Sequence, residues 1–90
     1  MATDLDTLRM FLAQVYQWPP EERANLGRVA EIFEAVHPTL YAALTEYLKD
    51  APTAVVYSYA ETRLNVPGEH RPWFRLLVME LRERAQKNIT

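Results

Sequence analysis

The chain has 90 residues and a mass of 10.5 kDa; 49% of the residues are hydrophobic, 24% are charged, and the formal net charge is −2 at pH 7. Chains of this length support a single hydrophobic core, so we expect one domain over residues 1–90. The absence of cysteine excludes disulfides and thiolate zinc sites, and no apolar run approaches the roughly 20 residues needed to span a bilayer.

Prolines and acidic residues mark the positions where helices are expected to begin. Proline fits the first helical turn because it fixes φ and lacks an N–H, and carboxylates there meet the positive end of the helix dipole. Apolar side chains at helical spacing follow each of these signals. The sequence therefore predicts an all-α, compact single-domain bundle of about five short antiparallel helices, over residues 4–17, 20–36, 38–49, 53–65 and 72–87.

The apolar spacing also predicts which face of each helix is buried. Large apolar and aromatic side chains at such positions are typical of core residues, and they indicate no cofactor-binding motif. The predicted core positions are Leu5, Leu8, Phe11, Leu12, Val15, Tyr16, Leu26, Val29, Ala30, Ile32, Phe33, Val36, Leu40, Leu44, Tyr47, Leu48, Trp73, Phe74, Leu77, Val78, Leu81 and Ala85.

Residues 54–66 leave one alternative open. Val55, Val56, Tyr57 and Tyr59 are β-branched or aromatic, and such residues also suit a strand. A helix is favoured because Pro52 makes a good helix entry and because a lone strand has no partner with which to pair. A strand at 54–66 would instead make the fold α+β.

The residue types that carry most enzymatic chemistry are scarce. Glycine occurs only at Gly27 and Gly68, so no glycine-rich phosphate-binding loop can be written. The single serine, Ser58, lacks the flanking glycines of a nucleophile elbow. His37 and His70 have no well-spaced metal-ligating partner, and we expect them at turns or helix entries. The sequence therefore predicts no enzyme, no cofactor and no metal site.

Charge is divided unevenly along the chain. Residues 1–61 carry nine acidic and four basic side chains, a net charge of −5, whereas residues 62–90 carry three acidic and six basic ones, a net charge of +3. Five of those six basic residues are arginine, whose planar guanidinium suits contacts with carboxylates. This asymmetry predicts another protein as partner, or self-association, through acidic and basic complementarity. The alternative is a solvated face balanced by intramolecular ion pairs.

The expected helix 72–87 carries the candidate partner-binding face. Two of its apolar residues fall outside the core stripe, and one of them lies within an arc of arginines, a pattern that resembles the apolar centre and polar rim of a protein interface. The candidate partner-binding residues are Arg71, Arg75, Leu76, Met79 and Arg82. The alternative is that this helix is central and buried on two sides, which would require no partner.

Two classes of function follow from these patterns. The first is a non-catalytic protein–protein interaction module, acting as an adaptor, an oligomerisation domain or a regulatory or inhibitory domain. The alternative is a helix-turn-helix DNA-binding regulator over residues 38–65, with Ser58, Thr62, Arg63 and Asn65 facing DNA. The turn lacks its usual glycine and the pI of about 5.6 is acidic, which argues against nucleic acid. The acidic start of the chain, without a secretory signal or a membrane span, predicts a cytoplasmic location.

Overall fold

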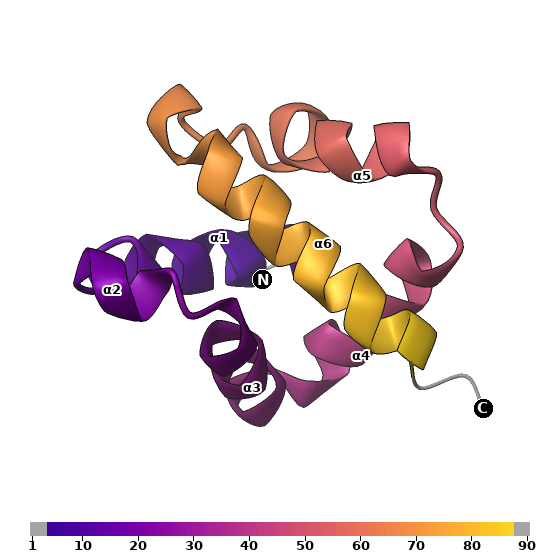
Figure 1. The fold of residues 1–90 in the computed structure, drawn as a ribbon, viewed down its shortest axis with the longest axis horizontal. Helices are drawn as coiled ribbons and strands as arrows, with labels where there is room; N and C mark the ends of the chain where they lie inside the picture. The colour runs from indigo at the N-terminus through magenta and orange to yellow at the C-terminus, as the bar shows by residue number, and fades with distance from the viewer. Residues whose placement is uncertain (1–3, 88–90) are drawn as a thin grey trace.

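A computed structural model describes the backbone of residues 4–87 and their side chains, except those at positions 60 and 61. In chain order the helices are α1 (Asp4–Val15), α2 (Pro20–Arg23), α3 (Leu26–Val36), α4 (Pro38–Lys49), α5 (Thr53–Tyr59) and α6 (Arg71–Lys87). A π-helical turn, Ala60–Leu64, follows α5, and a 3-10 turn, Gly68–His70, leads into α6. The predicted all-α fold is confirmed (Figure 1). The described residues contain no strand, so the strand alternative for 54–66 is wrong.

The single helix expected over residues 20–36 is divided in two. Helix α2 spans only four residues, and α3 begins after Asn25, whose side-chain oxygen accepts a hydrogen bond from the Arg28 backbone N–H at 3.3 Å. Asparagine favours helix caps over helix interiors, because its side chain competes for backbone hydrogen bonds. Gly27, in the first turn of α3, lowers the helix propensity of this stretch further. A cap residue therefore lies where the apolar periodicity indicated a continuous helix.

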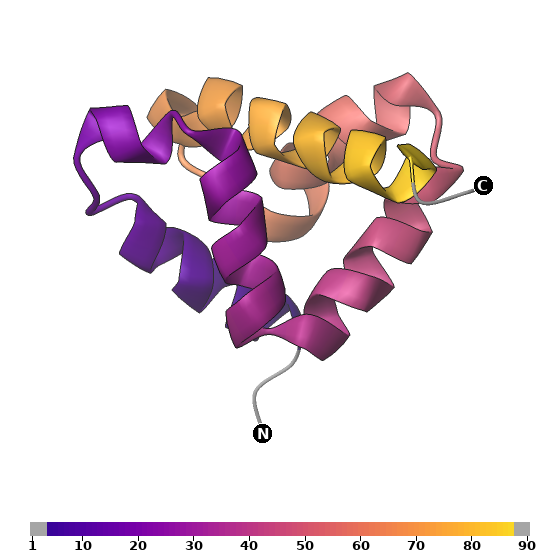
Figure 2. The same cartoon turned by 60° about the horizontal axis from the view of Figure 1, so that its bottom comes forward.

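Helices α3 and α4 meet at a sharp angle, and α6 lies across them. His37 is the only residue between α3 and α4, and Pro38 then starts α4, because its fixed φ suits a first helical turn. With a single connecting residue the two helices form the arms of a V instead of an antiparallel pair (Figure 2). Helix α6 spans the open side of the V and packs against both arms.

The core lies where α1, α3, α4 and α6 converge. Phe33 of α3 stacks on Phe11 of α1 with ring centroids 5.0 Å apart, and it meets Tyr41 of α4 edge-on at 5.8 Å. Two predicted core residues are in fact exposed: Val36 by 58% and Tyr47 by 49%. Val36 is the last residue of α3, and Tyr41, not Tyr47, is the buried aromatic of α4.

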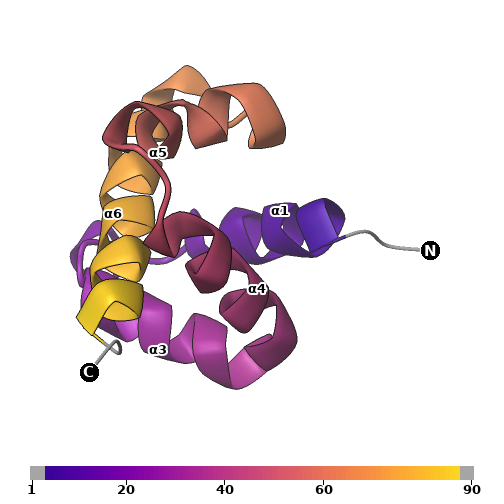
Figure 3. The same ribbon diagram turned by 90° about the vertical axis from the view of Figure 1, so that its right-hand side faces the viewer.

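The segment after α4 returns the chain to α6. Helix α5 has seven residues and continues without a break into the π-helical turn, so the helix expected over 53–65 is formed as far as Leu64, with a widened last turn. Asn65 then takes a left-handed conformation, with φ of 51°, which asparagine tolerates better than most side chains and which stops the helix. Figures 1 and 3 both show α1 between this segment and the α3–α4 pair.

Candidate functional site

The predicted partner-binding residues lie along α6, but they differ in exposure. Leu76 is 58% exposed on the outer side of the helix. Met79 is partly buried and packs against the core, so its placement outside the core is wrong. The inner stripe was predicted correctly, because its members Phe74, Leu77 and Val78 are all buried. The alternative, that α6 is central and buried on two sides, holds only in part. Helix α6 packs against both α3 and α4, but Leu76 remains at the surface.

The three arginines of this face are half-buried and are spaced to lie on one side of α6. Arg71 donates from Nε to the Val66 carbonyl oxygen at 3.0 Å, and Arg82 donates to the Thr53 hydroxyl at 3.4 Å. These bonds fasten α6 to the start of α5 and to the chain just after the π-helical turn. Arg71 and Arg82 are therefore oriented by the fold.

A further arginine of the basic C-terminal region serves a contact inside the fold. Arg84 donates from Nε to the Tyr41 hydroxyl at 3.2 Å and lies 3.8 Å from the Glu80 carboxylate. The hydrogen bond with Tyr41 raises the pKa of the Arg84 guanidinium above its usual value. Part of the positive charge of residues 62–90 is therefore engaged in joining α6 to α4.

The residues assigned to DNA in the helix-turn-helix alternative lie along α5, the π-helical turn and the residue that follows it. Ser58 belongs to α5, Thr62 and Arg63 to the π-helical turn, and Asn65 follows that turn. The hydroxyls of Ser58 and Thr62 donate to the carbonyl oxygens of Val55 and Ser58, at 3.2 Å and 2.9 Å. These two hydroxyls therefore donate to the chain's own backbone.

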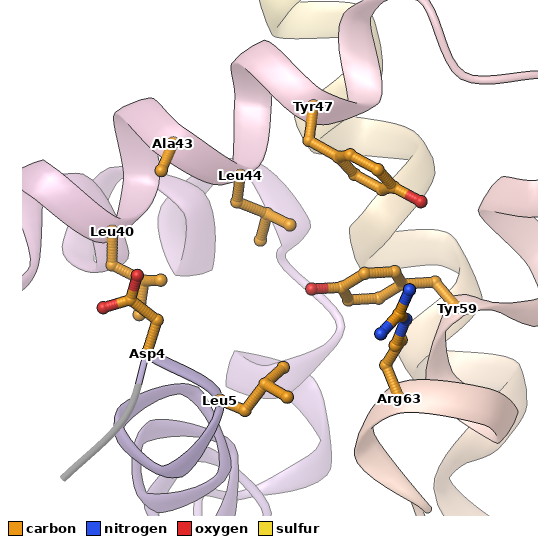
Figure 4. A pocket seen from close by; sticks show the side chains of 8 residues that line it. All are labelled: Asp4, Leu5, Leu40, Ala43, Leu44, Tyr47, Tyr59 and Arg63. Carbon is orange, nitrogen blue, oxygen red and sulfur yellow. The ribbon is translucent and has the colours of Figure 1, made fainter.

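A pocket of about 290 Å³ opens between the start of α1, one face of α4 and the segment from α5 into the π-helical turn. The sequence does not predict this pocket, because the elements that form the pocket are distant in the sequence. Figure 4 shows apolar side chains along one wall and two tyrosines beside an arginine on another. The lining residues are Asp4, Leu5, Leu40, Ala43, Leu44, Tyr47, Tyr59 and Arg63.

The two tyrosines form the polar side of this pocket. The rings of Tyr47 and Tyr59 have centroids 5.8 Å apart and are tilted by 44°. Burial raises the pKa of Tyr59, the neighbouring Tyr47 adds to that increase, and the positive charge of Arg63 acts against it. Tyr59 is therefore a neutral hydroxyl at physiological pH, and the Arg63 guanidinium lies close enough to influence it.

A second aromatic cluster joins α1, α2 and α6. The rings of Tyr16 and His70 stack with centroids 3.9 Å apart, and Trp73 meets Tyr16 edge-on at 5.5 Å. The Trp73 indole donates to the Arg23 carbonyl oxygen at 2.7 Å, and the Arg23 guanidinium donates to the Tyr16 carbonyl oxygen at 2.9 Å. The cluster closes one end of the molecule, and His70 lies at the entry to α6, as its sequence position indicated.

His37 occupies a comparable structural position. It lies between α3 and α4, with its ring edge-on to Phe11 at 5.9 Å. The two histidines thus pack against aromatic rings at different places. Among the side chains that the structure describes, no three from His, Asp or Glu are grouped so that they could hold a metal ion.

Comparisons with protein-family models, with curated proteins and with solved structures found no match for this chain. Among the helices of the described residues, none combines the length and the apolar character that crossing a membrane requires. Two features of the molecule bear on function: the outer face of α6 and the pocket beside Tyr59.

Proposed function

We propose that this chain is a non-catalytic protein-interaction module whose α6 binds an acidic surface of another protein or of a second copy. The observation that carries this proposal is the exposure of Leu76, 58% in the middle of the central helix of the fold. Removing a leucine side chain from water contributes about 1.5–3 kcal/mol, so an exposed one offers a gain on binding. We define the α6 face as Leu76 with Arg71, Arg75 and Arg82.

The charge distribution supports an acidic partner. Arg71 and Arg82 of the α6 face are held by hydrogen bonds to Val66 and Thr53, and orienting them in advance reduces the entropy lost on binding. Exposed carboxylates at Glu21 and Glu22 of α2 supply an acidic surface within the same chain. A head-to-tail contact between two copies would therefore be complementary in charge.

Light scattering at low and high salt tests the self-association form of this proposal. We expect association at low salt that weakens as salt screens the ion pairs. Leu76→Asp should abolish it, because an added carboxylate removes the apolar contact and opposes an acidic partner. Val36→Asp is the matched control, since Val36 has the same 58% exposure but lies at the end of α3. A wild-type protein that stays monomeric at low salt contradicts self-association.

Site-specific photocrosslinking in cells tests a different protein as partner. A photoreactive amino acid at position 76 should capture a defined protein, and the same amino acid at position 36 should not. Equal capture from both positions, or no capture from position 76 together with a monomeric protein, would refute the α6 face as a binding surface.

A further inference from the structure

The pocket between α1, α4 and the π-helical turn is a site of a different kind from the α6 face. Its volume of about 290 Å³ is close to the lower end of the range for small-molecule sites, which are mostly apolar and carry a few convergent polar groups. Leu5 of α1 and Leu44 of α4 approach it from opposite sides (Figure 4). Residues from three elements that are distant in the sequence thus line an open pocket of ligand size.

The polar groups of this pocket are arranged at different positions around the apolar wall. Asp4 lies beside Leu40 at one side, whereas Arg63 lies on the far side, next to the ring of Tyr59 (Figure 4). The Tyr59 hydroxyl points toward the space between Leu44 and Leu5. A bound molecule would therefore contact apolar side chains along one wall, and the Arg63 guanidinium and the neutral Tyr59 phenol at the other side.

From this arrangement we propose that the pocket binds a small amphipathic carboxylate, with its apolar body against Leu40 and Leu44 and its carboxylate on Arg63. The Tyr59 hydroxyl is placed to donate a second hydrogen bond. A guanidinium and a carboxylate form charge-assisted hydrogen bonds that are stronger than neutral ones. Asp4 repels an anion at the opposite side and so favours one orientation.

A cationic end group fits the Arg63 side of the same space less well, and the only carboxylate among the described residues that line the pocket, Asp4, lies at the opposite side. The faces of tyrosine rings attract cations, but the guanidinium of Arg63 already lies beside the ring of Tyr59. A second positive charge there would be repelled in a partly desolvated environment. The carboxylate is therefore the end group that the site selects.

Three ligands of one carbon skeleton test this proposal: phenylpropionate, phenylpropanol and phenylpropylamine. Titration into isotopically labelled protein should shift the NMR signals of Leu44, Tyr47 and Tyr59. The carboxylate should bind about tenfold more tightly than the alcohol, the factor that corresponds to one charge-assisted hydrogen bond. The amine, whose ammonium group suits the Asp4 side of the pocket and not the Arg63 side, should bind more weakly than the carboxylate. An amine as tight as the carboxylate, or shifts confined to other surfaces, would overturn the proposal.

Two variants separate the guanidinium from the cavity. Arg63→Gln should remove the tenfold preference for the carboxylate and leave binding of the alcohol unchanged, whereas Arg28→Gln, at an exposed arginine of α3, should change neither. Ala43→Phe fills the pocket and should abolish binding of all three ligands, with circular dichroism verifying the fold. A carboxylate preference that survives Arg63→Gln contradicts the site as proposed. Because Leu76 takes no part in this pocket, failure here leaves the α6 face untouched.

Discussion

At the scale of single residues, Tyr16 shows how burial sets the properties of a side chain. Its ring is held between helices by the stacking contact with His70. Its hydroxyl is buried and has no hydrogen-bond partner among the residues that the structure describes. Burial raises the pKa of Tyr16 to about 12, with the nearby Arg23 acting in the opposite direction. The fold thus favours the neutral phenol.

This pKa predicts a pH dependence of stability. The pKa of Tyr16 in the folded state lies above the ordinary value of 10.0, so the tyrosine ionises in the unfolded chain at a lower pH than in the folded one. The contribution of Tyr16 to the free energy of unfolding is therefore complete below pH 10 and is lost as the pH rises toward 12. Tyr16→Phe should be neutral or stabilising at pH 7, because it removes a buried hydroxyl without a partner.

Urea unfolding of both proteins between pH 7 and pH 12 checks this expectation. The wild-type midpoint should fall more steeply than that of Tyr16→Phe above pH 10. The same comparison for Tyr57→Phe, an exposed tyrosine of α5, serves as the control and should show no difference in slope. Parallel curves for Tyr16→Phe and the wild type would contradict the raised pKa.

At the scale of elements, the start of α3 is the position where local chemistry outweighs the apolar pattern. Asn25 caps the helix through the Arg28 backbone N–H, and the glycine two residues later lies within the first turn. A Cβ atom built at Gly27 would meet only the Asn25 side-chain oxygen at 3.8 Å, an ordinary contact distance. The same turn therefore contains one stabilising residue and one weak one.

Two substitutions in this turn should change stability in opposite directions. Asn25→Ala should lower the free energy of unfolding by about 1 kcal/mol through loss of the cap. Gly27→Ala should raise it by about 0.5–1 kcal/mol, because alanine loses less backbone entropy in a helix. Chemical denaturation measures both, and Asn25→Asp, which retains a capping oxygen, should stay close to the wild type. A destabilising Gly27→Ala would show that the first turn lacks the space described.

At the scale of the whole molecule, one continuous core joins helices that approach each other at different angles. Phe33 contacts rings on α1 and α4, and it is 1% exposed. Val36 lies one turn later on the same helix and is 58% exposed. A change at Phe33 should therefore affect the entire fold, whereas a change at Val36 should remain local.

Phe33→Ala should lower stability by about 3–5 kcal/mol, because it removes buried apolar surface and leaves a cavity. That loss is comparable to the lower end of domain stabilities, about 5 kcal/mol, so this variant should be largely unfolded at moderate temperature. Val36→Ala is the control and should change stability by less than about 0.5 kcal/mol.

Circular dichroism and tryptophan fluorescence should report one coincident unfolding transition for the wild type, because a single core predicts two-state behaviour. The two tryptophans, Trp18 and Trp73, pack against this core from different segments. Separate transitions from the two probes would contradict the expectation of one domain.

The sequence by itself determined the all-α fold class, the approximate helix starts and the inner stripe of α6. These features are local: proline and carboxylates act within one helical turn, and a helix turns by a constant angle per residue, so the side of Phe74, Leu77 and Leu81 follows from spacing alone. The sequence analysis also placed five candidate residues on one helix, with Leu76 exposed as expected.

The tertiary structure alone decided the angles between helices, the exposure of Tyr47 and the existence of the pocket. Spacing gives the apolar side of α4, but the packing partners decide how far around the helix burial extends, and the contacts of α4 with α3 and α6 leave Tyr41 buried and Tyr47 exposed. The pocket depends on Leu5, Leu44 and Arg63 meeting across three elements. Such contacts arise from how helices of given shape pack together, which no local pattern in the chain specifies.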